Sequence, residues 1–167
     1  MGQRDGLGNQ QERAEADLQW LGGVFDGEGS FSLVFNGRTE TATAMVRFTN
    51  TSDVMIAEVL RIIDAHGLPR HVQQLNPTTG TKPIWHISIN GAKRSRRFLE
   101  VVMPYLRAKR KEAAIVWDFV QSRLARLPGA QYSAEEVNWF LELRELHGYR
   151  LQQSSETIRL ALAKARR

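Results

Sequence analysis

The decisive stretch of this sequence reads Trp20-Leu21-Gly22-Gly23-Val24-Phe25-Asp26-Gly27-Glu28-Gly29-Ser30. Apolar residues at helical spacing lead into it, which predicts a helix over about residues 14–25, and alternating apolar and polar residues follow, which predicts a strand. Two glycines inside a helix cost about 1 kcal/mol each relative to alanine, so they need a structural reason. Because glycine has no side chain, a second helix could approach very closely at Gly22 and Gly23.

Two carboxylates, Asp26 and Glu28, stand where this helix should end in a glycine-rich turn. A helix C-terminus presents unpaired carbonyls and about half a negative charge, so acids are unfavourable there unless a cation is bound. Hard oxygen ligands of this kind suit Mg²⁺. The simpler interpretation is that Asp26-Gly27 only ends the helix, but it explains neither the paired glycines nor the second acid.

The rest of the chain alternates hairpins with helices. The pattern predicts strands over residues 30–35 and 39–49, a helix over 53–66, strands over 70–75 and 84–89, and helices over 93–106, about 113–124, 133–147 and after 155. Asn36-Gly37 is a strong hairpin signal because both positions tolerate a positive φ. Pro104 should bend the end of its helix, and Ser133 with Glu136 is typical of a capping box. This order predicts an α+β fold with one antiparallel sheet.

Size and composition narrow the classes of function. A chain of 167 residues predicts one domain, over residues 14–167, after a loose Gly- and Gln-rich segment at 1–13. The absence of cysteine excludes disulfides and thiolate metal sites. A formal charge of +5 is a modest indication of a polyanionic partner. There is no long apolar run and no signal-like N-terminus, so we expect no membrane and an intracellular location, in prokaryotic cytoplasm or an organelle.

Residues 21–29 resemble the signature motif of the LAGLIDADG homing endonucleases, and the order of elements around them is similar to that family. The segment at 155–159, Ser-Glu-Thr-Ile-Arg, adds to the likeness. The resemblance implies an αββαββα core with a four-stranded antiparallel, saddle-shaped sheet plus C-terminal helices. One copy of the motif implies a homodimer with two-fold symmetry. The interface residues implied for the motif helices are Leu18, Leu21, Gly22, Gly23 and Phe25.

The resemblance also implies roles in catalysis. Glu28 would bind the catalytic Mg²⁺, with the carbonyl of Gly27 as a further ligand, and Mn²⁺ or Ca²⁺ could take the same place. Lys109 matches a lysine near the scissile phosphate, where it would stabilise transition-state charge or organise water. Arg47 falls where relatives often carry glutamine. It could hold a phosphate or orient water, and an ordinary arginine on a strand surface is nearly as good an interpretation.

The implied substrate is a long, pseudo-palindromic double-stranded DNA site, cut on both strands, with the two hairpins in the major groove. The base-contact candidates are Ser30, Ser32, Val34, Asn36 and Arg38 on the first hairpin and Arg70, His71, Gln73, His86 and Ser88 on the second. Candidates for phosphate contacts are Lys93, Arg94, Arg96, Arg97, Arg166 and Arg167. The alternatives are an intron RNA maturase, a non-catalytic DNA-binding protein on the same scaffold, or a metal-binding dimer unrelated to nucleic acid.

Overall fold

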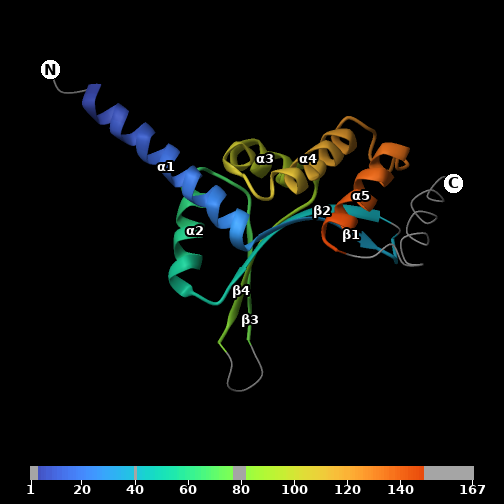
Figure 1. Ribbon diagram of the computed structural model, residues 1–167, viewed down its shortest axis with the longest axis horizontal. Coiled ribbons are helices and arrows are strands. Elements are labelled where there is room, and N and C mark those ends of the chain that lie inside the picture. The colour runs from blue at the N-terminus through green and yellow to red at the C-terminus, as the bar shows by residue number, and fades with distance from the viewer. Residues whose placement is uncertain (1–3, 40, 77–81, 149–167) are drawn as a thin grey trace.

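The computed structural model describes residues 4–39, 41–76 and 82–148. The elements are α1 (Arg4–Glu28), β1 (Gly29–Asn36), β2 (Thr41–Asn50), α2 (Asp53–Ala65), β3 (His71–Leu75), β4 (Ile84–Asn90), α3 (Ala92–Val102), η1 (Met103–Tyr105), α4 (Arg110–Leu124) and α5 (Ala134–Leu146). The predicted α+β fold and the order helix, hairpin, helix, hairpin, helix are confirmed (Figure 1).

The four strands form one antiparallel sheet in the order β1-β2-β4-β3. Each hairpin pairs its own two strands, and the hairpins join because β2 also pairs with β4, from Met45↔Asn90 to Asn50↔Trp85. The helices lie on one side of the long, curved sheet (Figure 1). Side chains therefore alternate along each strand between a face covered by helices and an open face.

The hydrophobic core lies between the helices and the covered face. Leu21 and Phe25, one turn apart on α1, are both completely buried in it. The centroid of the Phe25 ring lies 5.0 Å from the ring centroid of Phe98 on α3 and 5.8 Å from that of Phe48 on β2. Burial of each such side chain stabilises the fold by about 1.5–3 kcal/mol, so the end of α1 is held firmly against the sheet.

Three element boundaries differ from prediction. Helix α1 begins at Arg4, and its residues 9–13 are exposed, so the apolar periodicity on which the prediction rested does not extend to them. It also continues through Glu28, with no turn before β1. Helix α3 ends at Val102, because Pro104 cannot continue the α-helical hydrogen bonds and lies in the short 3₁₀ turn η1.

The other local predictions have mixed outcomes. The capping box of Ser133 and Glu136 is present at the start of α5. The predicted loop residues 77–80 and the predicted last helix after Ser155, with Arg166 and Arg167, lie outside the described residues. Within the described part of the chain, no helix has the length and apolar character needed to cross a bilayer.

The outer end of the first hairpin is tied to the helices through Tyr132. Its hydroxyl donates to the carbonyl of Ala42 at 3.3 Å and accepts from the N–H of Ala42 at 2.7 Å, at a point of β2 that β4 does not reach. The guanidinium of Arg123 lies over the Tyr132 ring and contacts the fully buried carboxylate of Glu136 at 3.3 Å. The Tyr132 side chain therefore links the outer part of β2 to the charged contact between α4 and α5.

Candidate functional site

The site begins at the junction of α1 and β1. At Gly29 a Cβ atom would lie 2.6 Å from the Phe25 ring and 2.7 Å from the Phe25 carbonyl oxygen, so only glycine fits where the chain passes directly from helix to strand. Glu28 is consequently the last residue of the helix. Its side chain is exposed and has no hydrogen bond or ion pair among the described residues, which leaves its carboxylate available to a ligand.

Lys109, eighty residues further along the chain, is brought to the same junction. Its ammonium group donates to the carbonyl oxygen of Gly27 at 3.1 Å and to that of Gly29 at 2.6 Å. These two carbonyls flank Glu28. The fold therefore places a half-buried positive charge at the two carbonyls next to the exposed Glu28, so the two predicted site residues come from the same junction.

Asp26 has a different environment from Glu28. Its two carboxylate oxygens accept hydrogen bonds from the backbone N–H groups of Arg107, at 2.7 Å, and Lys109, at 2.9 Å. Burial opposes ionisation, but the N–H groups of Lys109, Arg107 and Ala108 outweigh it and lower the pKa of Asp26 below its ordinary value. The prediction that both acids need a cation is therefore corrected: backbone N–H groups of the loop after η1 stabilise the charged carboxylate of Asp26, and of these two acids Glu28 remains without a partner among the described residues.

Replacing Asp26 with asparagine should lower the free energy of unfolding by about 1–3 kcal/mol at pH 7, because the amide can accept only one of the two backbone bonds and carries no charge. Since folding lowers the pKa of Asp26, its contribution is complete above about pH 3.8 and disappears as the pH falls through the lower folded-state value. The difference between Asp26→Asn and wild type in denaturant melts should shrink over that range. Asp118→Asn, at an exposed position on α4, is the control, and its free energy of unfolding should stay close to that of wild type both at pH 7 and over the acid range.

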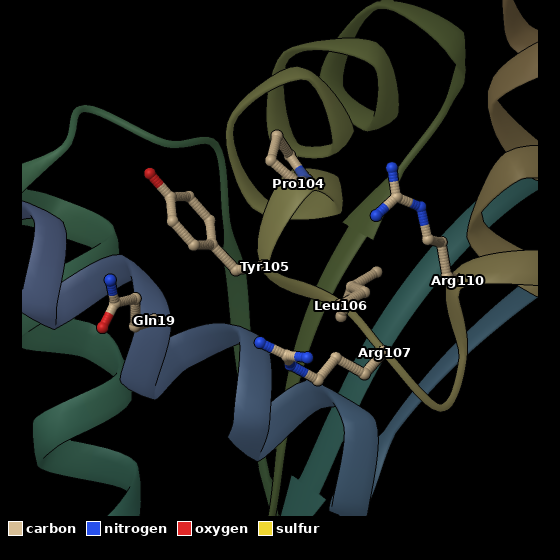
Figure 2. Close-up of a pocket in the computed structure, with 6 residues that line it drawn as sticks. All are labelled: Gln19, Pro104, Tyr105, Leu106, Arg107 and Arg110. Carbon is tan, nitrogen blue, oxygen red and sulfur yellow. The ribbon is translucent and has the colours of Figure 1, made fainter.

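Gly22 is needed within the protomer. A Cβ at this position would lie 2.6 Å from Cβ of Tyr105 and 2.8 Å from its carbonyl oxygen, because η1 crosses α1 here. Figure 2 shows Tyr105 and Arg107 lying along α1 beside Gln19. The expected reason for Gly22, contact with a second molecule, is thus replaced by a contact with η1 of the same chain.

Gly23 lies on the other side of α1. It is exposed, and a Cβ added to it or to Gly27 would meet nothing within 4 Å. Together with the partly exposed Trp20, these positions follow one another at spacings of three and four residues and form one side of the helix. We call Trp20, Gly23 and Gly27 the open side of α1.

The remaining residues predicted at the dimer interface are less accessible. Leu18 is half-buried, and Leu21 and Phe25 are fully buried in the protomer's own core. Helical geometry explains this, since these residues lie on the side of α1 that packs against the sheet and α3, away from the open side. Of the five predicted interface residues, only Gly23 is exposed.

The open face of the sheet brings together most of the predicted base-contact residues. Alternation and register place Ser30, Ser32, Val34, Asn36, His71, Gln73, His86 and Ser88 on this face, although Ser88 is buried. Arg38 lies exposed in the turn between β1 and β2. Arg70 precedes β3, and its Nε and one terminal nitrogen donate to the carboxylate of Asp64 on α2, at 2.6 and 2.9 Å, so it does not lie on the open face.

Arg47 lies at the centre of the open face, between Ser30 on β1 and Ser88 on β4. Its side chain is half-buried; one terminal nitrogen is 3.2 Å from the sulfur of Met45, and its Nε is buried with no hydrogen-bond partner. A buried donor without a partner is unfavourable, so this conformation leaves part of the hydrogen-bonding capacity of Arg47 unused at the centre of the open face.

Two groups of basic residues lie elsewhere. Lys93, Arg94, Arg96 and Arg97 are exposed on α3, which packs on the covered side of the sheet, so they lie away from the open face. Arg107 and Arg110 line a depression of about 410 Å³ with Gln19, Pro104, Tyr105 and Leu106 (Figure 2). The second group was not predicted, because the approach of η1 to α1 that forms it has no signal in the local sequence.

The oxygen atoms at the end of α1 are of the kind that Mg²⁺ prefers, but they are few. Among the described residues, no three His, Cys, Asp or Glu side chains are close enough together to hold a metal ion. One chain offers the carboxylate of Glu28 and the carbonyl of Gly27, whose oxygen already accepts a hydrogen bond from Lys109, whereas Mg²⁺ takes about six oxygen ligands, often from water and phosphate. The residues present therefore fit part of a magnesium site.

These features define a class: an αββαββα domain whose first helix ends in an exposed acid beside a two-hairpin sheet with an open polar face. The family model of the LAGLIDADG-like domain matches residues 15–103, more than half of the chain. The chain therefore belongs to the LAGLIDADG family, as the resemblance of residues 21–29 predicted. No curated protein matches the chain.

Solved structures with the same fold include the homing endonuclease I-CvuI in complex with its target in the presence of calcium. It has a TM-score of 0.65 and 17% identity, over 92% of this chain and 96% of that one. A second I-CvuI complex, with the I-CreI target and magnesium, has a TM-score of 0.61 at 14% identity. The meganuclease I-AabMI bound to uncleaved DNA has a TM-score of 0.56 at 15% identity, over 76% of this chain but only 43% of that one.

Proposed function

We propose that this protein is a homing endonuclease that makes a metal-dependent double-strand break in a long, pseudo-palindromic DNA site as a homodimer. The observation that carries the proposal is the exposed, unpartnered carboxylate of Glu28 beside the ammonium group of Lys109, at the inner end of an open polar sheet face. The structures with the same fold are those of nucleases bound to DNA, which supports this choice among the activities of the family.

The open side of α1 supports the homodimer. Gly23 and Gly27 each lower helix stability by about 1 kcal/mol relative to alanine, and no contact within the protomer requires either of them. A second α1 helix could pack closely against this side, because the absence of side chains at Gly23 and Gly27 lets two helix backbones approach each other. The fold spans less than half of the I-AabMI chain, as expected if two copies of this protein do the work of one such longer chain.

In such a dimer the ends of both α1 helices meet near the symmetry axis. Glu28 and the carbonyl of Gly27 from each protomer would hold Mg²⁺ there, with phosphate oxygens and water completing the ligands. When bound, Mg²⁺ would polarise the phosphate, favour ionisation of the attacking water and stabilise the leaving oxygen. The Mg²⁺ charge would also relieve repulsion between the two nearby carboxylates, which have no ion pair within the described part of their own protomers.

Lys109 would stabilise negative charge on the phosphate of the substrate. Its ammonium group has a third proton beyond those donated to Gly27 and Gly29, and that proton can point to a phosphate oxygen or an ordered water. Arg47 would serve as a donor to DNA from the middle of the open face. Two copies together carry twice the formal +5, which favours association with a duplex.

The test is cleavage of a library of randomised DNA duplexes by the full-length protein in Mg²⁺, with sequencing of the cut ends. We expect cuts on both strands within pseudo-palindromic sites, and a loss of rate of about a thousandfold or more when EDTA removes the metal. Cleavage that continues in EDTA would contradict the proposal. Specific binding without cleavage would favour the non-catalytic alternative, and preference for intron RNA over any duplex would favour a maturase.

A further inference from the structure

The second hairpin carries an exposed apolar pair on the open face of the sheet. Leu75 on β3 and Ile84 on β4 are directly opposite each other in the register, and 41% and 37% of their surfaces are exposed. The next pair on the same face, Gln73 and His86, is polar. An apolar pair and a polar pair of side chains thus follow one another along the hairpin, on the surface that would face DNA.

The requirements of folding do not explain this pair. A hairpin that needs only to bury one face would turn its apolar residues toward the helices and its polar residues outward. At the end of β3 neither side is buried: Gln74, on the side of the helices, and Leu75, on the open side, are both exposed, so the aliphatic pair lies in contact with solvent. Val34, the other strongly exposed aliphatic side chain on this face, differs in that it borders a depression walled by Phe140 and Leu143 of α5.

The groups on the open face of the second hairpin favour some bases over others. The described strand residues of β3 and β4 on this face include neither a carboxylate, which would accept a hydrogen bond from the amino group of cytosine, nor an arginine or lysine, which would bind guanine. The C5 methyl of thymine is the apolar group that base edges present in the major groove. Glutamine, present at position 73, is the side chain that makes paired hydrogen bonds to adenine.

From this arrangement we infer that the second hairpin reads an A·T-containing segment in each half of the target, with Leu75 and Ile84 packed on a thymine methyl group. The inference rests on the proposed DNA-binding function and names the bases that this part of the site requires. Gln73 is placed to read an adenine next to that thymine, since Gln73 and Leu75 project from the same face of β3.

The experiment removes one methyl group from the DNA. From a duplex selected by the full-length wild-type protein, each thymine is replaced in turn by deoxyuridine, which differs only in lacking the C5 methyl. Binding is measured in Ca²⁺. At one thymine in each half-site we expect about a fourfold rise in Kd, and about fifteenfold when both halves are changed, as loss of one buried methyl group per half-site predicts.

The protein side is tested with the double variant Leu75→Ser and Ile84→Ser. Serine removes the aliphatic groups and, unlike threonine, leaves no side-chain methyl that could contact thymine. In this variant the deoxyuridine effect at that thymine should disappear, whereas a merely structural role would weaken binding to all duplexes and leave the effect intact. Val54→Ser, at a side chain 81% exposed on α2, is the control and should keep the full effect. Thermal melts establish that each variant is folded.

Two failures are distinguishable. If a specific duplex is selected but no thymine methyl depends on Leu75 and Ile84, this inference is overturned and the proposed function stands. If selection yields no specific duplex at all, the proposed function fails and the inference fails with it.

Discussion

Glu28→Gln is expected to reduce DNA cleavage in Mg²⁺ by about three orders of magnitude or more while leaving specific binding intact. The amide keeps the length and shape of the side chain but removes the charge with which a carboxylate holds a divalent cation, and loss of such a metal contact corresponds to several kcal/mol of transition-state stabilisation. Because the carboxylate has no partner within the protomer, its replacement should not disturb the fold. Single-turnover cleavage and gel-shift titration of the same duplex give the two quantities.

The matched control is Glu12→Gln, the same chemical change at an exposed position on the same helix, which should cleave at the wild-type rate. Because a homodimer carries the substitution in both protomers, it removes both repelling charges, so Glu28→Gln should also bind DNA without metal at least as tightly as wild type. Undiminished cleavage by Glu28→Gln would remove this residue from the mechanism and leave the proposed chemistry without its metal ligand.

Adjacent glycines should give opposite results when each is replaced by alanine. Gly22→Ala should destabilise the protomer by about 1–3 kcal/mol, because the new Cβ would lie 2.8 Å from the backbone oxygen of Tyr105 and one of the two elements must shift. Gly23→Ala meets nothing within 4 Å, so it should leave the protomer unchanged or up to about 1 kcal/mol more stable. The same substitution should weaken the dimer at least about tenfold, because two added methyl groups would separate two closely packed helices.

Sedimentation velocity over a concentration series gives the dimer constant, and denaturant melts at concentrations below it give the stability of the protomer. Trp20, partly exposed on the open side of α1, should report association through its fluorescence. If Gly23→Ala dimerises as wild type does, or if the wild-type protein stays monomeric even on its duplex, the open side of α1 is not the interface. Gly27→Ala should likewise weaken the dimer without destabilising the protomer, which would show that the effect is not peculiar to position 23.

Much of the fold could be predicted from short-range patterns. Alternation in residues 30–35 and the apolar stripe of residues 53–66 each express a preference that a few neighbouring residues determine, and the structure contains the corresponding strand and helix. The first hairpin is present, but the predicted Asn36-Gly37 turn is wrong in detail: Asn36 still pairs with Thr41 at the end of β1, and Gly37 does not have a positive φ. The start of α1 was misplaced because its residues 9–13 are polar and exposed and so carry no apolar period. Prediction by periodicity detects the packed part of a helix and not its solvated part.

The identity of the candidate site followed from the motif, but the roles of its members did not. The sequence alone indicated an acid at the end of a glycine-containing helix, and it indicated the family and the order of the elements. From the sequence alone Gly22 could not be distinguished from Gly23, nor Asp26 from Glu28. Two neighbouring residues of the same kind differ in role only when a distant segment packs against one of them.

Only the tertiary structure separated those pairs. The chain from η1 to Lys109 returns across α1 about eighty residues later, covers Gly22, binds Asp26 through backbone N–H groups and places the Lys109 ammonium beside Glu28. Gly23 and Glu28, on the uncovered side, stay open to other molecules. Local preferences decide which elements form, whereas the contacts that assign a function to one glycine or one acid come from a segment far away in the chain, and no local pattern encodes them.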